Sequence, residues 1–167
     1  MRITLPILFL LTASMSNSYA GPVEDLSAVL NNRLGTSSED RRVDDTTNVL
    51  GAIVKTGCHG DVLDANVRIT GVSGKLEGDT AIMTVTYSGG YTRQGWAFPC
   101  QKVSSNLGGL EEKKVSGSYE FRVTGKAFQK PTITWGAGRN FGEVTDPNHD
   151  SNKMAIRAVE NAIASAF

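Results

Sequence analysis

The spacing of hydrophobic positions changes along this chain, and its first part predicts helices. Residues 22–34 place leucine and valine three or four positions apart, with acidic residues early and Gly35 after the last leucine, which predicts an amphipathic helix. Residues 36–45 are polar and charged and predict a solvated loop or a solvated helix face. An apolar stripe over residues 48–55 predicts a second, short helix. Because Gly51 weakens a helix interior, a strand is the competing interpretation.

A two-residue alternation with β-branched side chains and glycine-marked turns follows, and it predicts antiparallel strands joined by hairpins. We expect a three-strand meander in which Ser88, Gly89 and Gly90 turn the chain into the third strand, an exposed loop over residues 101–114, and two more strands. The expected strands cover residues 62–72, 79–87, 91–98, 118–124 and 127–135. Pro131 makes an edge position or a bulge more likely than a central position for the last strand, since proline cannot donate to a sheet ladder.

The end of the chain predicts a closing helix. After an irregular stretch over residues 136–147, Asp150 or Ser151 can cap a helix that runs to Phe167. Its apolar stripe is Ile156, Val159, Ile163 and Phe167, opposite Lys153, Arg157, Glu160 and Asn161. The whole pattern predicts an α+β fold, an antiparallel sheet of about five strands with two N-terminal helices and a C-terminal amphipathic helix packed on one face.

The N-terminal residues are typical of an export signal. Arg2 precedes a mostly apolar segment over residues 3–11, and the small residue Ala20 ends the polar stretch that follows. The apolar segment is too short for a membrane span, which needs roughly 20 residues. We therefore expect residues 1–20 to be cleaved and residues 21–167 to form a single compact domain without stable membrane insertion.

The charges of the chain argue against nucleic-acid and anionic-lipid partners. The sequence has 17 basic and 17 acidic residues, and removal of Arg2 leaves 16 against 17. Such a balance provides no field that would attract a polyanion. The chain also has no motif that requires a cofactor, so we expect none.

The two cysteines, Cys58 and Cys100, predict one disulfide in an exported protein. Such a bridge would close a loop of about 43 residues and stabilise the fold by roughly 4 kcal/mol. A catalytic thiol beside His59 and Asp61 is the alternative, but neighbouring side chains on an extended chain point apart. The chain has no Asn-x-Ser/Thr acceptor for N-glycosylation. Together with the expected disulfide, this favours the bacterial periplasm or secretion.

Tryptophan, arginine and tyrosine dominate the energetic centres of protein interfaces, and two segments of the chain concentrate them. The first segment contains the candidate binding residues Tyr91, Arg93 and Trp96, which together with Phe98 precede Cys100. The second is the glycine-rich stretch 135–142, which contains the candidates Trp135 and Arg139. The first group forms either the aromatic core of a sheet edge or a partner-binding face. The second does not have the glycine spacing of a dinucleotide phosphate loop, so a flexible loop is expected there.

Oxygen and imidazole ligands also gather before the last helix. Glu143, Asp146, His149 and Asp150 are secondary candidates for a divalent metal. Their spacing matches neither the calcium loop nor a zinc site, and a helix dipole alone favours acidic residues there. We therefore expect no resident metal.

The leading functional hypothesis is an exported, non-enzymatic binding or accessory protein of inhibitor, immunity or envelope-assembly type, which recognises another envelope or secreted protein. One alternative is a carrier of a small apolar ligand or lipid, which needs a cavity of about 300 to 1,000 Å³. Another is a small hydrolase that uses His59 or His149, the two imidazoles of the chain.

Overall fold

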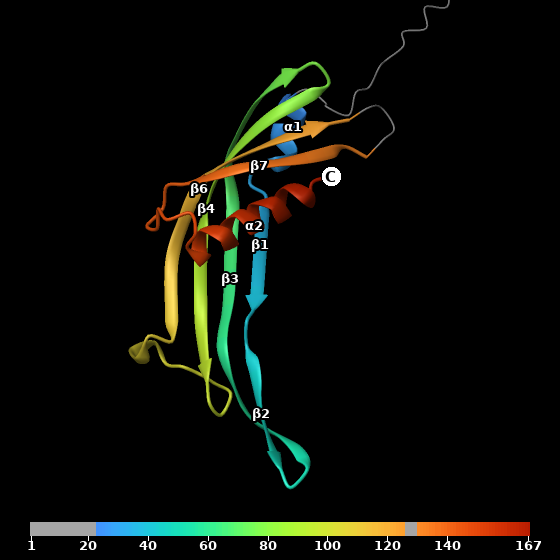
Figure 1. Ribbon diagram of the computed structural model, residues 1–167. Coiled ribbons are helices and arrows are strands. Elements are labelled where there is room, and N and C mark those ends of the chain that lie inside the picture. The colour runs from blue at the N-terminus through green and yellow to red at the C-terminus, as the bar shows by residue number, and fades with distance from the viewer. Residues whose placement is uncertain (1–22, 126–129) are drawn as a thin grey trace, which may run out of the picture.

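A computed structural model describes residues 23–125 and 130–167 (Figure 1). The segment expected to be cleaved, residues 1–20, lies outside these ranges. The helices are α1 (Val23–Leu30) and α2 (Asp150–Ala164), with a 3-10 turn η1 (Ser105–Leu107). The strands are β1 (Leu34–Asp40), β2 (Val43–Val49), β3 (Ala52–Glu77), β4 (Thr80–Ala97), β5 (Gln101–Lys102), β6 (Leu110–Thr124) and β7 (Thr132–Asn140).

The strands form an antiparallel sheet with the order β1-β3-β4-β6-β7, and β2 and β5 add to β3 and β4 outside this path. β3 and β4 run along most of the molecule (Figure 1). β1 and β2 pair with different stretches of β3, so β2 continues along the side of β3 beyond β1. The predicted α+β class is confirmed, but the sheet has seven strands instead of about five.

One N-terminal helix was predicted correctly and the other was wrong. The first helix is confirmed as Val23–Leu30, shorter than expected. The segment over residues 48–55 is a β-hairpin instead, in which Val49 pairs with Ala52. Leu50 and Gly51 form the turn with φ of 52° and 83°. Two consecutive positive φ values are typical of the type I′ turn, whose twist matches that of the flanking strands.

The polar segment over residues 36–45 is not a loop either, because it supplies most of β1 and the first residues of β2. The expected turn at Gly89 and Gly90 is also wrong, since β4 passes straight through it. A Cβ atom at Gly89 would lie 1.9 Å from the carbonyl oxygen of Asn66 on β3. Glycine is therefore required here by close backbone approach and not by a turn.

The later strands agree better with the sequence pattern. The loop expected over residues 101–114 is shorter, because β6 starts at Leu110 and continues through the predicted strand 118–124. β7 lies at the edge of the sheet, as Pro131 predicted. It extends to Asn140 and so includes part of the stretch expected to be irregular. The residues expected to begin this strand, 127–129, lie outside the described ranges.

Both helices pack on one face of the sheet in a single apolar cluster. α1 contributes Leu26 and Leu30, and the sheet contributes alternate residues of β3, β4 and β6, including Tyr119 and Phe121. The predicted C-terminal helix is confirmed, with Val159 fully buried in this cluster. Its N-cap is His149 and neither Asp150 nor Ser151, because Nδ1 of His149 accepts a hydrogen bond from the backbone N–H of Ser151 at 3.2 Å.

α2 also covers β1. A Cβ atom at Gly35 would lie 1.9 Å from the carbonyl oxygen of Ala158, so helix and strand backbones are in direct contact. The side chain of Asn161 donates to the carbonyl of Thr36 at 2.8 Å, and Ser37 Oγ donates to the carbonyl of Met154 at 2.7 Å. These contacts cover β1, whereas β2 lies away from α2 (Figure 1).

Candidate functional site

A two-stranded hairpin projects from one end of the molecule, and we call residues 43–59 the arm (Figure 1). It consists of β2 and the first residues of β3, joined by the Leu50–Gly51 turn. β3 begins to pair with β4 only at Gly60, which lies opposite Trp96. Within the described residues, the two strands of the arm therefore form backbone ladders only with each other.

The end of the arm carries apolar side chains on both faces. Val49 lies opposite Ala52 and Val54 lies opposite Thr47, so these side chains share one face of the hairpin. Ile53 lies on the other face and is 79% exposed. Most other residues of the arm are polar, so the apolar side chains form a distinct tip. Contiguous exposed apolar side chains of this kind mark interaction sites in soluble proteins.

Leu50 occupies the most exposed position of the tip. Its relative exposure is 103%, which means that its side chain contacts almost nothing else in the chain. Its φ of 52° is in the left-handed region, which costs a branched side chain roughly 1 to 2 kcal/mol and which asparagine or glycine adopts more readily. Neither packing nor turn geometry explains a leucine at this position.

The root of the arm is fixed to the rest of the sheet by the disulfide between Cys58 and Cys100. The predicted pairing is thus confirmed, and the bridge is buried, with Cys58 1% exposed. Phe98 lies over Gly57, where a Cβ atom would come within 2.9 Å of its ring. A buried disulfide is typical of proteins from oxidising, extracellular compartments.

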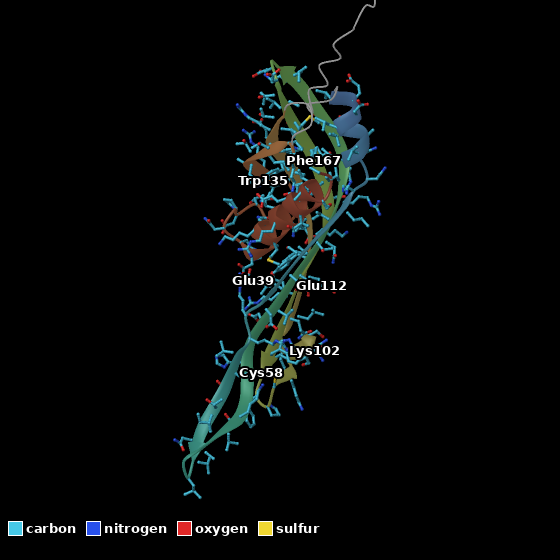
Figure 2. The ribbon with its side chains drawn as sticks, turned by 90° about the vertical axis from the view of Figure 1, so that its right-hand side faces the viewer. Glu39, Cys58, Lys102, Glu112, Trp135 and Phe167 are labelled. Atoms are coloured by element: carbon cyan, nitrogen blue, oxygen red, sulfur yellow. A yellow bond between two sulfur atoms is a disulfide. The ribbon has the colours of Figure 1, made fainter. Side chains whose placement is uncertain are left out.

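Trp96 lies beside this bridge between two cations. The guanidinium carbon of Arg42 is 4.7 Å from the centroid of its ring, and Nζ of Lys102 is 5.9 Å from it. Such cation–π contacts orient the ring. In Figure 2 the labelled Lys102 and Cys58 lie at the level where the arm begins.

Polar contacts flank the apolar tip on the side of the root. Nζ of Lys55 lies 2.9 Å from Oδ1 of Asp44, and Nδ1 of His59 lies 3.2 Å from the carboxylate of Asp45. Nearer the body of the sheet, hydrogen bonds from Arg42 lower the pKa of Asp40 to about 2. The arm thus has an apolar end and a charged base.

The structure separates the five candidate binding residues. Trp96 lies next to the root of the arm, where it is paired with Gly60. Tyr91 is buried in the core, its ring 6.4 Å from that of His149, and burial raises its pKa to about 12. Arg93 is exposed and donates to Asp61 at 2.7 Å.

Trp135 and Arg139 lie on β7. Figure 2 shows Trp135 far from the arm. Trp135 is on the helix face of the sheet, its ring 6.5 Å from that of Tyr119. Arg139 is exposed on the outer face opposite Ser118. The expected flexible loop over residues 135–142 is therefore largely strand.

Three of the four metal candidates make contacts that have structural roles. Asp146 accepts the backbone N–H of Asn148, His149 caps α2, and Asp150 binds Arg41. Within residues 23–125 and 130–167, no three His, Cys, Asp or Glu side chains are grouped to hold a metal ion.

The histidines of the hydrolase hypothesis lie apart from each other, one in the arm and one before α2. Nδ1 of His149 lies 2.9 Å from Oγ of Ser151, but Ser151 is fully buried, so its hydroxyl does not face solvent. The side chain of His59 is exposed and contacts Asp45. Cys58 has no free thiol, because it is bound to Cys100.

Three open hollows lie on the outer face of the sheet, away from the helices. Their volumes are about 390, 440 and 410 Å³, and residues such as Asn66, Arg68, Glu112 and Arg139 line them. A carrier needs a cavity that encloses most of its ligand, and these shallow hollows are open to solvent. Among the described helices, none is long and apolar enough to cross a membrane.

Sequence reasoning missed the arm, although its signal is visible. The run Val49 to Val54 is apolar except for Gly51 at its centre, and it was interpreted as a buried helix stripe. Comparison with known proteins finds no matching family model, curated protein or solved structure. We therefore infer function from the geometry of the arm.

Proposed function

We propose that the protein is an exported, non-enzymatic binding protein that recognises another envelope or secreted protein through the tip of the arm. The observation that carries this proposal is Leu50, a leucine fully exposed in a left-handed turn. A branched apolar residue in that conformation opposes local stability. Residues retained against local stability are frequently functional, and burial in a partner would use this side chain.

The rest of the arm supports the same function. Exposed apolar side chains on both faces of a narrow hairpin suit insertion into a groove of a partner protein. The disulfide at Cys58 and the contact between Phe98 and Gly57 restrict the root, so the tip is presented with less conformational freedom. Such preorganisation increases affinity because less entropy is lost on binding. An inhibitor, an immunity factor or an envelope-assembly factor would each use an arm of this kind.

The buried disulfide and the N-terminal segment together support export. A buried bridge between the two cysteines forms readily in the periplasm or outside the cell and is rare in a reducing cytosol. The sequence of residues 1–20 fits the same route.

The test is a pull-down with residues 21–167 from envelope extract of the source organism, with partners identified by mass spectrometry. Leu50→Asn is the decisive variant, because asparagine is favoured in a type I′ turn and the hairpin should remain intact. We expect one stoichiometric partner, whose affinity falls about 10- to 30-fold with Leu50→Asn.

The matched control is Leu76→Asn, the same chemical change at the opposite end of β3, where the leucine is 53% exposed. This control should keep the partner. If both variants retain the partner equally, the tip is not the binding site and the proposal is wrong.

A further inference from the structure

The outer side of β2 is an open sheet edge. On β1, α2 packs against the face of the strand at Gly35, and Asn161 of α2 donates to the backbone carbonyl of Thr36. β2 pairs with β3 on one side and, within the described residues, with no strand on the other. Figure 1 shows this edge at the far end of the molecule from α1.

The register identifies the backbone groups that face away from β3. In a hairpin closed by a two-residue turn, the residues that flank the turn, Val49 and Ala52, exchange hydrogen bonds with each other. Hydrogen-bonded and non-hydrogen-bonded pairs alternate in antiparallel sheets, so Thr47 also bonds to Val54. Asn48 and Thr46 therefore direct their N–H and C=O groups outward, where another strand can bind them.

A third strand would also complete a marginal element. An isolated two-stranded hairpin has little stability in water, whereas three strands with an apolar face are stable. Val49 lies on β2 at the open edge, and Ala52 and Val54 lie on the same face one strand further in, on β3. Alternate side chains of an added strand would lie beside this stripe.

The charges of the arm favour a basic partner strand over a second copy of this chain. Asp44 and Asp45 lie on the edge strand itself, whereas Lys55, which pairs with Asp44, and His59, which contacts Asp45, lie on β3. A strand added beside β2 therefore meets the two carboxylates first, and acidic residues on an edge strand oppose pairing with a second copy of β2. Lysine or arginine on an added strand would instead be attracted.

We propose that β2 accepts an extended segment of the partner protein as an additional strand, and that this segment alternates β-branched apolar residues with lysine or arginine. This inference rests on the proposed function and specifies how the same arm recognises its partner. Backbone hydrogen bonds to Thr46 and Asn48 would provide affinity, and the side-chain pattern would provide specificity.

The test uses a defined probe, an eight-residue peptide that alternates valine with lysine. A peptide that alternates valine with glutamate is the control. Binding is followed by NMR through chemical shifts and amide hydrogen exchange of the intact oxidised protein. We expect the lysine peptide to protect the amides of Thr46 and Asn48 and to bind at least about 10-fold more tightly than the glutamate peptide.

Two variants separate strand addition from other contacts. Thr46→Pro removes an outward N–H from the edge and should abolish protection at Asn48, whereas Thr46→Val keeps this N–H and should bind normally. The double variant Asp44→Asn with Asp45→Asn leaves the backbone unchanged and should remove the preference for lysine. Because this second test does not involve proline, it remains decisive if Thr46→Pro disturbs the arm.

Several outcomes would overturn the inference. They are no protection of the β2 amides, equal binding of both peptides, or protection of β2 by self-association without peptide. In the pull-down, loss of the partner with Leu50→Asn but not with Thr46→Pro would leave the proposed function intact and exclude strand addition. Retention of the partner by both variants would exclude both.

Discussion

Arg41 joins the start of the arm to the start of α2 through Asp150. Its Nη1 and Nη2 donate to the two carboxylate oxygens of Asp150 at 3.0 and 3.2 Å. Nε donates to Glu39 at 2.7 Å, and these two carboxylates raise the pKa of Arg41 further above its usual value. Arg41 lies between β1 and β2, so this pair determines where the arm leaves the body of the sheet.

Asp150→Asn should loosen this junction with little loss of global stability. The side chains of Arg41 and Asp150 are 41% and 31% exposed, and exposed ion pairs contribute at most about 1 kcal/mol. We expect amide hydrogen exchange at Arg41 and Arg42 to accelerate up to about 5-fold. Asp44→Asn, which breaks the exposed pair with Lys55, is the control and should leave these amides unchanged. Equal exchange in both variants would contradict a role for the pair at the junction.

Removal of the disulfide should cost far more stability. Cys58 and Cys100 are 42 positions apart, so the double variant Cys58→Ser with Cys100→Ser should lose roughly 4 kcal/mol in the free energy of unfolding. Urea denaturation measures this loss. A reducing agent should destabilise the natural protein by a similar amount and leave the double variant unaffected. A loss below about 1 kcal/mol would show that the bridge does not constrain the unfolded chain.

Two neighbouring glycines should respond in opposite ways to alanine. A Cβ atom at Gly89 would lie 1.9 Å from the carbonyl oxygen of Asn66, so Gly89→Ala must displace β4 from β3. We expect a loss of roughly 1 to 3 kcal/mol or more. At Gly90 no atom lies within 4 Å of the added carbon, so Gly90→Ala should be neutral or slightly stabilising. Thermal unfolding of both variants checks the prediction, and equal melting temperatures would contradict it.

Alkaline stability should depend on Tyr87. Its hydroxyl donates to Oδ1 of Asn140 at 2.5 Å, and burial raises its pKa from 10 to about 12. The unfolded state therefore loses this proton first, so the free energy of unfolding should fall as the pH rises from about 10 to 12. Below pH 10 this contribution is complete. Urea midpoints at pH 8, 10 and 11 measure the slope.

Tyr87→Phe should make this alkaline slope shallower, because it removes the titrating group. Asp40→Asn is the control, since the pKa of Asp40 is about 2 and its carboxylate does not titrate in this range. An unchanged slope in Tyr87→Phe would mean that other groups, such as the buried Tyr91, carry the alkaline transition.

The sequence pattern predicted an element correctly where the residues that indicate it have one common structural role. The helix of residues 150–164 follows from its apolar spacing, and Val159 is buried as expected. β7 lies at a sheet edge, as Pro131 predicted, although the strand itself begins only after this proline, at Thr132. The cysteine count predicted the bridge between Cys58 and Cys100.

The pattern failed at two glycines, because a glycine in a sequence can have more than one structural role. Gly51 indicated either a weakened helix or a strand, yet it is one half of a turn between two strands. Gly89 indicated a turn, yet it permits close contact with Asn66 on another strand. Local periodicity contains no information on the distance between strands that are remote in sequence, so these two cases look alike.

The candidate site shows the same division. Trp96 was recognised from its aromatic and cationic neighbours, but its partners Arg42 and Lys102 come from other elements. Leu50 was absent from the predicted site, because a leucine in an apolar run is normally buried. Only the fold shows that this run forms the tip of a hairpin, where Leu50 is exposed to solvent.

The sequence by itself determined the α+β class, the terminal helix, the disulfide and the balance of charge, because these depend on composition and on neighbours along the chain. The tertiary structure alone decided that residues 43–59 form an arm, that α2 covers β1 but not β2, and that Leu50 faces solvent. The physical reason is that burial depends on which segments meet in space. The same apolar residues that form a core when covered form an interaction surface when they are not.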